Sequence, residues 1–307
     1  MRIPLGLVGV GKIARKQHLP TVAASPVFDL VAAADPYQNL PGVPHYPTLE
    51  EMLSGRDEIA AIAICTPPQM RHRIARLALW AGKHVLLEKP PCATLNELDE
   101  LKALARERGC TLFTAWHSQH APGVAAARRW MEARRPIEIS VIWKEDVRVW
   151  HPGQTWIWQP HGLGVFDAGI NALSILTSIL PCRMSMKTAD LFFPANRQAP
   201  IAADLSFVTE GGAPVSAVFD WHGADAQTWD IVVQTDDGGV LRLSNGGARL
   251  EIDGVVVVDE AEGEYGSIYA RFADLISEGA SEVDGRPLKH VVDAFMLGKR
   301  VDIAAFD

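Results

Sequence analysis

The chain has 307 residues and a formal net charge of −8, with 29 Lys and Arg against 37 Asp and Glu. This length predicts two domains of about 100–200 residues each, and a hydrophobic content of 48% is typical of a globular protein. An acidic chain in which no basic segment dominates argues against a nucleic-acid partner. The apolar runs fall well short of the roughly 20 residues that span a bilayer, which argues against a membrane role.

The first third of the chain alternates strand-like and helix-like segments. An apolar strand at Ile3–Val8 runs into Gly9–Ala14 and a helical stretch towards Ala24. Further strands are predicted at Phe28–Ala34, Ala60–Cys65, His84–Glu88 and Thr111–Ala115, and helices near Thr48–Leu53, Gln69–Ala81 and Thr94–Arg108. Thr94 and Glu97 have the spacing of a capping box. We therefore predict an α/β fold in which residues 1–120 form a dinucleotide-binding Rossmann domain with a doubly wound parallel sheet.

The glycine turn of this first domain is the candidate cofactor site. Gly9 permits a tight turn, Gly11 allows close approach of a pyrophosphate, and Ala14 keeps the helix near the sheet, with Lys12 and Ile13 between them. The third position of the fingerprint is alanine rather than glycine, and such a turn can also simply connect a strand to a helix. Its place at the N-terminus, between strand and helix, favours dinucleotide binding.

Asp35 ends the second predicted strand, where a carboxylate can accept hydrogen bonds from the adenosine ribose. It would also repel a 2′-phosphate, so we expect NAD as the preferred cofactor. The alternative is that Asp35 only begins an Asp-Pro turn. Lys12, Arg15 and Lys16 lie nearby in the sequence and would weaken the repulsion, which leaves NADP open.

Lys89 directly follows the predicted strand His84–Glu88 and precedes two prolines. Ligands of doubly wound sheets bind outside the carboxyl ends of the strands, so this lysine is expected where a substrate would meet the nicotinamide. Taken in isolation, a lysine is far more often solvated surface.

The four cysteines stand far apart, without C-x-x-C spacing or a secretory leader ahead of them, at Cys65, Cys92, Cys110 and Cys182. We expect buried free thiols and a cytoplasmic protein. His117 and His120 are three residues apart, but no cysteine or carboxylate at ligand spacing completes a zinc site, so no metal is expected.

After about residue 120 strand-like segments dominate. Strands are predicted at Ile137–Trp143, Met186–Phe193, Ile201–Val208, Pro214–Trp221, Thr228–Gln234 and Val240–Leu243, and helices at Pro122–Arg134, Gly169–Ile179, Tyr269–Glu278 and Pro287–Ala305. Residues 121–307 are therefore predicted to form an α+β domain with a large, mainly antiparallel, open-faced sheet that binds substrate, and the last helix can pack back on the first domain. An uncovered sheet face of apolar character would pair with its copy, so we expect a homodimer.

Several motifs in order along the chain carry a family resemblance. They are Gly9–Ala14 with His18-Leu19-Pro20, Cys65-Thr66-Pro67-Pro68, Ala81–His84 leading to Glu88-Lys89-Pro90, and Gly162–Asn171. In this arrangement the chain resembles the glucose-fructose oxidoreductase/inositol dehydrogenase (Gfo/Idh/MocA) family over nearly its whole length. The resemblance implies that the cofactor is bound by Gly9, Gly11, Lys12, Ile13, Ala14, Asp35, Thr66, Pro67, Glu88 and Lys89.

Narrower runs point to one kind of reaction within that family. They are Ala115–Ser118, Trp143–Arg148, Trp150–Gln154 and Trp156–Pro160, and they resemble the members that oxidise the anomeric carbon of D-galactose or L-arabinose. Many family members have histidine four residues after the aspartate of the later motif, whereas this chain has Asn171, as those members do. The resemblance thus implies an NAD(P)-dependent aldose 1-dehydrogenase that forms an aldonolactone.

The same resemblance assigns roles to individual residues. Lys89 and Asp167 become the proton-handling pair and Asn171 positions the anomeric hydroxyl, with the choice of base left open. The residues expected to bind the sugar are His117, Glu145, His151 and Trp150. By themselves Asp167 and Asn171 would be a helix cap followed by a polar turn, and at least one of the tryptophans nearby is expected to be core.

Two rival functions fit the same fold. One is a sugar or dinucleotide sensor without catalysis, and the other is a dehydrogenase that acts on another sugar or inositol hydroxyl. A complete Lys89, Asp167 and Asn171 set favours catalysis, and Asn171 with the run Trp150–Gly153 favours C1.

Overall fold

The computed structural model describes residues 2–223, 227–261 and 263–307. The chain forms two compact units, one of Met1–His117 with Glu264–Gly285 and the other of Ser118–Gly263 with Arg286–Asp307. The sequence predicts a boundary at residues 120 and 121 and allows the last helix to pack back on the first domain. In the structure α8 (Glu264–Glu278) belongs to the first unit, while the last helix, α9 (Arg286–Leu297), belongs to the second unit.

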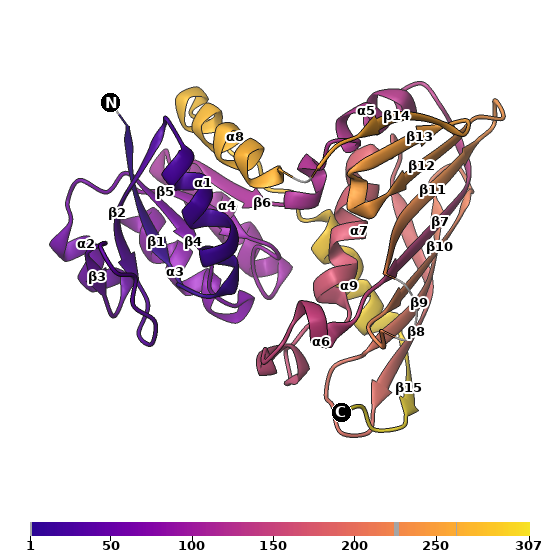
Figure 1. The fold of residues 1–307 in the computed structure, drawn as a ribbon, viewed down its shortest axis with the longest axis horizontal. Helices are drawn as coiled ribbons and strands as arrows, with labels where there is room; N and C mark the ends of the chain where they lie inside the picture. The colour runs from indigo at the N-terminus through magenta and orange to yellow at the C-terminus, as the bar shows by residue number, and fades with distance from the viewer. Residues whose placement is uncertain (1, 224–226, 262) are drawn as a thin grey trace. The chain divides into compact units, whose positions relative to one another are not determined.

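In the described part of the first unit, six strands form a parallel sheet in the order β3-β2-β1-β4-β5-β6 (Figure 1), which confirms the predicted Rossmann fold. The strands are β1 (Ile3–Val8), β2 (Phe28–Ala34), β3 (His45–Tyr46), β4 (Ala61–Ile64), β5 (His84–Glu88) and β6 (Leu112–Ala115). The helices are η1 (Ala14–His18), α1 (Leu19–Ala24), α2 (Leu49–Gly55), α3 (Pro68–Trp80), α4 (Leu95–Arg108) and the returning α8. The central strands are buried on both faces, as a parallel sheet between helices requires.

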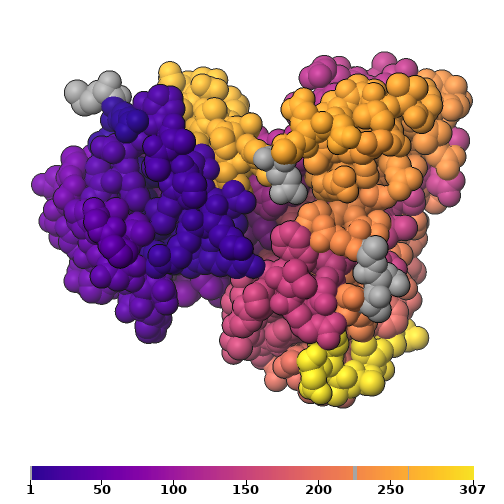
Figure 2. All heavy atoms as spheres, in the orientation of Figure 1, coloured from indigo at the N-terminus to yellow at the C-terminus, as the bar shows by residue number. Residues whose placement is uncertain are grey.

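Helix α8 covers one face of this sheet although it lies some 150 residues farther along the chain than β6. Its Phe272 stacks on Phe28 and on Phe113, with ring centroids 5.6 and 6.3 Å apart. Figure 2 shows its yellow-orange surface lying against the indigo surface of the N-terminal elements of the same unit. A helix that the sequence places among the strands of the second half thus completes the core of the first.

The predicted capping box of α4 is confirmed. The backbone N–H of Glu97 donates to Thr94 Oγ1 at 3.2 Å, and the N–H of Thr94 donates to Glu97 Oε2 at 3.1 Å. The two bonds satisfy backbone donors that the helix itself leaves unpaired. The helix therefore begins where the sequence motif predicts.

In the described part of the second unit, nine strands form one sheet in the order β14-β13-β12-β11-β7-β10-β9-β8-β15. All neighbours are antiparallel except the pairs β7–β10 and β8–β15. The strands are β7 (Pro136–Lys144), β8 (Met184–Pro194), β9 (Ala202–Thr209), β10 (Pro214–Asp220), β11 (Thr228–Thr235), β12 (Val240–Ser244), β13 (Arg249–Ile252), β14 (Val255–Asp259) and β15 (Lys299–Ile303). The helices are η2 (His117–His120), α5 (Val124–Met131), α6 (Val147–Trp150), η3 (Thr155–Trp158), α7 (Phe166–Ile179), η4 (Asn245–Gly247) and α9. This confirms the mainly antiparallel sheet.

The predicted last helix, Pro287–Ala305, is wrong in its second half. Helix α9 ends at Leu297, and residues Lys299–Ile303 form β15, which pairs in parallel with β8. A Cβ on Gly298 would lie 2.3 Å from the Ala294 carbonyl oxygen, so the chain leaves the helix at a residue without a side chain. The C-terminal segment then pairs with the edge of β8 and becomes a strand of the sheet (Figure 1).

One face of the second sheet carries α7 and α9 (Figure 1), and the other face mixes polar and apolar side chains along its middle strands. Ser140, Ser216, Ser206 and Thr188 lie opposite one another on β7, β10, β9 and β8, which places a row of hydroxyls across four strands. The outer face that is predicted to be apolar therefore carries both kinds of side chain, because the outward positions of these strands include short polar residues as well as Ile142, Val218 and Val232.

Gly169 tests the fit of α7 on the second sheet. A Cβ there would lie 2.4 Å from the buried Phe219 ring on β10, so we expect Gly169→Ala to lower the free energy of unfolding by about 1–3 kcal/mol. The matched control is Gly266→Ala in α8, where an added Cβ meets no described atom within 4 Å and should stabilise by about 0.5–1 kcal/mol. Urea unfolding of both variants measures the difference, and equal stabilities would contradict the packing described.

Candidate active site

The glycine turn after β1 has the shape that a dinucleotide requires. Gly9 has a φ of 89°, and a Cβ there would lie 2.9 Å from the backbone nitrogen of Thr66. At Gly11 a Cβ would meet no described atom within 4 Å, so the backbone borders open space where a helix begins. Thr66 Oγ1 is buried and has no hydrogen-bond partner among the described residues. A close backbone approach, a helix start and an unsatisfied hydroxyl together fit a bound pyrophosphate.

The carboxylate of Asp35 stabilises its own turn and is also hydrogen-bonded to the glycine turn. Its Oδ1 accepts hydrogen bonds from the N–H groups of Tyr37 and Gln38, each at 2.8 Å, and its Oδ2 accepts from Val10 N–H at 2.8 Å. A carboxylate offers about four acceptor positions, so these bonds from described residues leave room for a ribose hydroxyl. Arg15 Nε donates to the Val10 carbonyl at 3.1 Å, which brings a cation to the same turn.

The backbone on both sides of Lys89 is held by neighbouring side chains. Its N–H donates to Glu88 Oε2 at 3.0 Å, and Arg71 donates to the carbonyl of Glu88 at 2.7 Å and also to that of Pro90. The Lys89–Pro90 peptide is cis. Arg71 Nε further donates to the Thr66 carbonyl at 2.7 Å, so one guanidinium joins the loops after β4 and β5. Lys89 therefore stands on a fixed backbone at the carboxyl end of β5.

Beneath Lys89 lies a group of buried polar side chains that we call the Glu88 cluster: Glu88, His18, Arg71, Tyr265 and Tyr269. Glu88 Oε1 lies 2.9 Å from His18 Nε2 and accepts a hydrogen bond from the Tyr265 hydroxyl at 2.5 Å. His18 Nδ1 lies 2.8 Å from the Tyr269 hydroxyl. The ring of His117 stacks on Tyr265, with centroids 5.9 Å apart, so this predicted sugar ligand packs against the cluster.

The cluster keeps Glu88 ionised despite its burial. Burial raises the pKa of Glu88, but the hydrogen bond and charge of His18 and the charges of Arg71 and His117 outweigh it and hold the pKa at about 2. Burial lowers the pKa of His18, and its contacts with Cys65, Tyr269 and Glu88 raise it well above the ordinary value. Glu88 and His18 thus form a buried ion pair. Burial and the neighbouring carboxylate raise the pKa of Tyr265, which stays a donor.

In the second unit the structure brings together three of the predicted site residues. His151 Nε2 lies 3.4 Å from Glu145 Oε1, and His151 Nδ1 lies 3.6 Å from Asp167 Oδ2. Trp221 donates its indole N–H to Glu145 Oε1 at 3.1 Å and packs on the His151 ring at 4.8 Å between centroids. An imidazole between two buried carboxylates offers donors and acceptors that match the hydroxyls of a sugar.

The sheet topology explains why these residues meet. Strands β7 and β10 are parallel neighbours with Lys144 opposite Asp220, so the residues that follow them, Glu145 and Trp221, emerge at the same edge. Asp167 lies in the first turn of α7, where the positive end of the helix dipole favours a carboxylate. It is buried, so it is more than the exposed helix cap that its sequence alone allows.

The other predicted residues of this unit are placed differently. Trp150 is 40% exposed, donates its indole N–H to Gln227 at 2.9 Å and packs on Trp229 at 5.1 Å between centroids. Trp158 packs on Trp221 instead, with centroids 5.7 Å apart. Asn171 is half-buried one turn after Asp167 in α7.

Several residues of the site were not singled out from the sequence. They are Arg71, Tyr265 and Tyr269 around Glu88, and Trp221 beside His151. His18 and Gln154, which lies 3.1 Å from His151 Nδ1, belong to sequence motifs but have no predicted role of their own. Trp221 directly follows β10, which is a parallel neighbour of β7, and this position at a strand end is the one feature that could have identified it. The alternation of polar and apolar residues does not reveal which strands pair, so the sequence could not place Trp221 beside Glu145.

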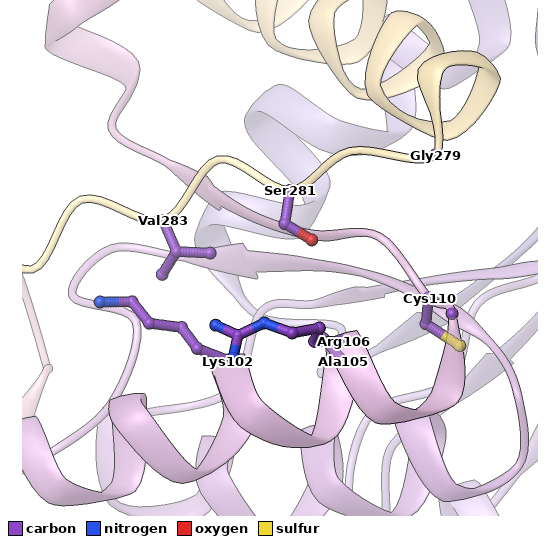
Figure 3. A pocket seen from close by; sticks show the side chains of 8 residues that line it. Lys102, Ala105, Arg106, Cys110, Gly279, Ser281 and Val283 are labelled. Atoms are coloured by element: carbon purple, nitrogen blue, oxygen red, sulfur yellow. The ribbon is translucent and has the colours of Figure 1, made fainter.

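Each unit also has a surface cavity away from these residues. The first, of about 410 Å³, lies between α4 and the segment after α8 and is lined by Lys102, Arg106, Cys110, Ser281 and Val283 among others (Figure 3). It borders the amino end of β6, whereas ligands of doubly wound sheets bind beyond the carboxyl ends. The second, of about 450 Å³, is lined by Arg183, Arg286, Lys289 and His290 among others. None of the described lining residues belongs to the predicted site.

All four cysteines lie in the described ranges and are free, with Cys65, Cys92 and Cys110 buried. Burial raises the pKa of the Cys92 thiol to about 12, so it is unreactive. Among the described residues no group of three or more His, Cys, Asp or Glu side chains is placed to hold a metal ion. In that part of the chain no helix combines the length and apolarity needed to cross a membrane.

A parallel Rossmann sheet with a glycine turn, joined to an antiparallel sheet with a polar site, defines a nicotinamide-dependent oxidoreductase. Residues 3–116 match the Gfo/Idh/MocA profile, described as an oxidoreductase family with an NAD-binding Rossmann fold. The chain is 47% identical over 306 residues to galactose 1-dehydrogenase of Pseudomonas fluorescens, covering 99% of this chain and 98% of that protein. The chain belongs to the Gfo/Idh/MocA family, which confirms the resemblance.

Two solved structures are similar to this chain over nearly its whole length. D-galactose-1-dehydrogenase from Rhizobium etli is 53% identical and superimposes with a TM-score of 0.95, covering 100% of this chain and 98% of that one. A 3-ketoreductase from Actinomadura kijaniata, crystallised with NADP and TDP-benzene, is 20% identical with a TM-score of 0.83, covering 99% of this chain and 100% of that one. The latter likeness concerns the fold alone.

The buried Glu88 makes the stability of the protein depend on acid pH. Its pKa is lowered from 4.5 to about 2, so its stabilising contribution is present above pH 4.5 and is lost as the pH falls towards 2. The shift corresponds to about 3 kcal/mol. Glu88→Gln should remove this part of the pH dependence of the free energy of unfolding, measured by urea unfolding between pH 2 and 6.

The matched control is Glu100→Gln, because Glu100 is an exposed carboxylate that also pairs with a histidine, His72, at 3.0 Å. Exposed ion pairs contribute little, so this variant should keep the acid dependence of the parent. An unchanged pH slope in Glu88→Gln would contradict the buried ion pair.

Proposed function

We propose that the chain is an NAD(P)-dependent aldose 1-dehydrogenase that oxidises the anomeric carbon of D-galactose, and also of L-arabinose, to the aldonolactone. The observation that carries this proposal is the identity of about half of all residues, over the full length, with two galactose 1-dehydrogenases. Lys89 at the end of a Rossmann strand and the buried group around His151 supply the side chains that such a reaction needs.

The cofactor residues follow from the glycine turn and its neighbours. Gly9, Gly11 and Ala14 shape the pyrophosphate site with Lys12 and Ile13, Thr66 and Pro67 form the loop that faces the turn, and Glu88 and Lys89 end the strand beside it. Asp35 favours NAD because its carboxylate accepts ribose hydroxyls and repels a 2′-phosphate. Arg15 beside the same turn lowers that repulsion, so NADP is the second cofactor.

Lys89, Asp167 and Asn171 carry the proton chemistry. When bound, the nicotinamide supplies the acceptor for the hydride that leaves C1. Lys89 and Asp167 form the proton-handling pair, and one of the two removes the proton of the C1 hydroxyl, so that the C–H and O–H bonds break as the C=O bond of the lactone forms. Asn171 positions that hydroxyl through its amide.

Glu145 and His151 bind the remaining hydroxyls of the sugar, and His117 and Trp150 add to the substrate site. The indole N–H of Trp221 fixes the Glu145 carboxylate, and its ring fixes His151, so both polar groups are preorganised. Aromatic faces pack well against the C–H face of a pyranose.

We further propose a cytoplasmic homodimer. Four free cysteines, three of them buried, suit a reducing compartment. The face of the second sheet opposite α7 and α9, with its row of hydroxyls, is the surface that would meet a second copy.

Initial rates of NADH formation with a panel of aldoses test the reaction. We expect turnover with D-galactose and L-arabinose, a lactone as product, and a loss of about 10²–10⁴-fold in kcat/KM for Lys89→Ala. The control is Lys187→Ala on the exposed side of β8, which should keep full activity. Sugar binding without NADH formation would establish a sensor, and a ketose product would establish oxidation at another carbon.

The cofactor preference is tested at Asp35. Asp35→Asn keeps the size of the side chain and one oxygen for the backbone bonds but removes the charge that repels a 2′-phosphate. We expect the ratio of kcat/KM for NADP over NAD to rise about tenfold or more. Asp29→Asn, at an exposed position of the same strand, is the control and should leave the ratio unchanged. An unchanged ratio in Asp35→Asn would remove Asp35 from the discrimination.

A further inference from the structure

The Glu88 cluster is a set of buried polar and charged groups in which only Glu88 has a place in the function proposed above, at the edge of the cofactor site, and none has a part in proton transfer. Glu88 is 2% exposed, His18 0% and Arg71 5%. Burying an ion pair rarely stabilises a fold more than apolar side chains of similar volume would. Packing alone therefore does not explain the cluster, and its hydrogen bonds indicate a role at the backbone of Lys89.

The two oxygens of the Glu88 carboxylate have separate partners. Oε1 is held by His18 and by the Tyr265 hydroxyl, at 2.9 and 2.5 Å. Oε2 is left to accept the backbone N–H of Lys89 at 3.0 Å. The orientation that His18 and Tyr265 impose on the carboxylate is thus transmitted to the peptide that carries Lys89.

Arg71 holds the same segment from the other side. Its guanidinium donates to the carbonyls of Glu88 and Pro90, the residues before and after Lys89. Since guanidinium donors are rigidly planar, bonds to both carbonyls fix the direction in which the chain leaves β5. The Cα of Lys89 then has little freedom.

The anchors of the cluster come from elements at both ends of the first unit. His18 is the last residue of η1, a π-helical turn between the glycine turn and α1, and such turns often occur at functional sites. Tyr265 and Tyr269 lie one turn apart in α8 and contact Glu88 and His18 respectively. The cluster therefore joins the cofactor helix, α8 and the end of β5 through one carboxylate.

We propose that Glu88, oriented by His18 and Tyr265, is a positioning residue that fixes the backbone of Lys89 for proton transfer. This inference rests on the proposed function, in which Lys89 handles the proton of the C1 hydroxyl. Glu88 does not touch the sugar in this scheme. It acts only through the Lys89 peptide, so its loss lowers kcat and spares substrate binding.

Two conservative variants test the positioning role. Glu88→Gln keeps the shape of the side chain and removes its charge, and Tyr265→Phe removes one hydrogen bond to Oε1. Because small displacements of a catalytic group are costly, we expect kcat with galactose and NAD to fall roughly 10–100-fold in both, with KM within about twofold. His18→Gln serves as the third variant, so that the test stands even where one of them fails to fold.

The matched control separates positioning from stability. Phe272→Leu changes another buried residue of α8, one whose ring stacks on Phe28 and Phe113. We expect it to lower the thermal unfolding temperature at least as much as Tyr265→Phe does while keeping kcat. An equal fall of kcat in Phe272→Leu, or a full kcat in the Glu88 and Tyr265 variants, would overturn the proposal.

A second readout is independent of turnover. Acylation of lysines by an amine-selective reagent, followed by mass spectrometry, gives the reactivity of Lys89 relative to the exposed Lys187 in the same sample. We expect this ratio to change in Glu88→Gln and Tyr265→Phe and to stay constant in Phe272→Leu. If the parent protein oxidises no sugar, the proposed function fails, and the labelling ratio then decides the positioning role: a constant ratio in all variants overturns it.

Discussion

A buried carboxylate that must stay ionised is the constraint on which the first unit depends. Glu88 can keep its charge only while His18, Arg71 and Tyr265 surround it, and these residues come from η1, α3 and α8. Each of those elements therefore contributes to the shape that the end of β5 adopts. The hydrogen bonds of Glu88 and Arg71 also hold the backbone on both sides of Lys89, so the packing of the unit and the position of this lysine's backbone share one physical cause.

In both units residues of the candidate site follow strands that have a parallel neighbour. Lys89 follows β5, Glu145 follows β7 and Trp221 follows β10. Parallel strands leave a sheet at the same edge, so residues distant in sequence come together there with their side chains beyond the last hydrogen bond. The second sheet is antiparallel nearly throughout, and its site has formed at one of its two parallel pairs.

Prediction succeeded where local chemistry decides the outcome. Strands β1, β2 and β5 and the capping box of Thr94 and Glu97 have the predicted bounds, since an uninterrupted apolar run and a reciprocal cap act within a few residues. It failed at the C-terminus, where residues after Leu297 have a helical pattern but pair with β8. The partner that decided the outcome lies about a hundred residues away, and no local pattern carries that information.

The sequence by itself determined the Rossmann fold, the glycine turn and the family, because these rest on short motifs with a local physical meaning. Only the tertiary structure decided that α8 completes the first core, that Tyr265 and Arg71 hold Glu88, and that Trp221 orients Glu145 and His151. Those contacts join residues tens to hundreds of positions apart. They form because buried charges and indole N–H groups must find partners once the sheets have placed them out of water.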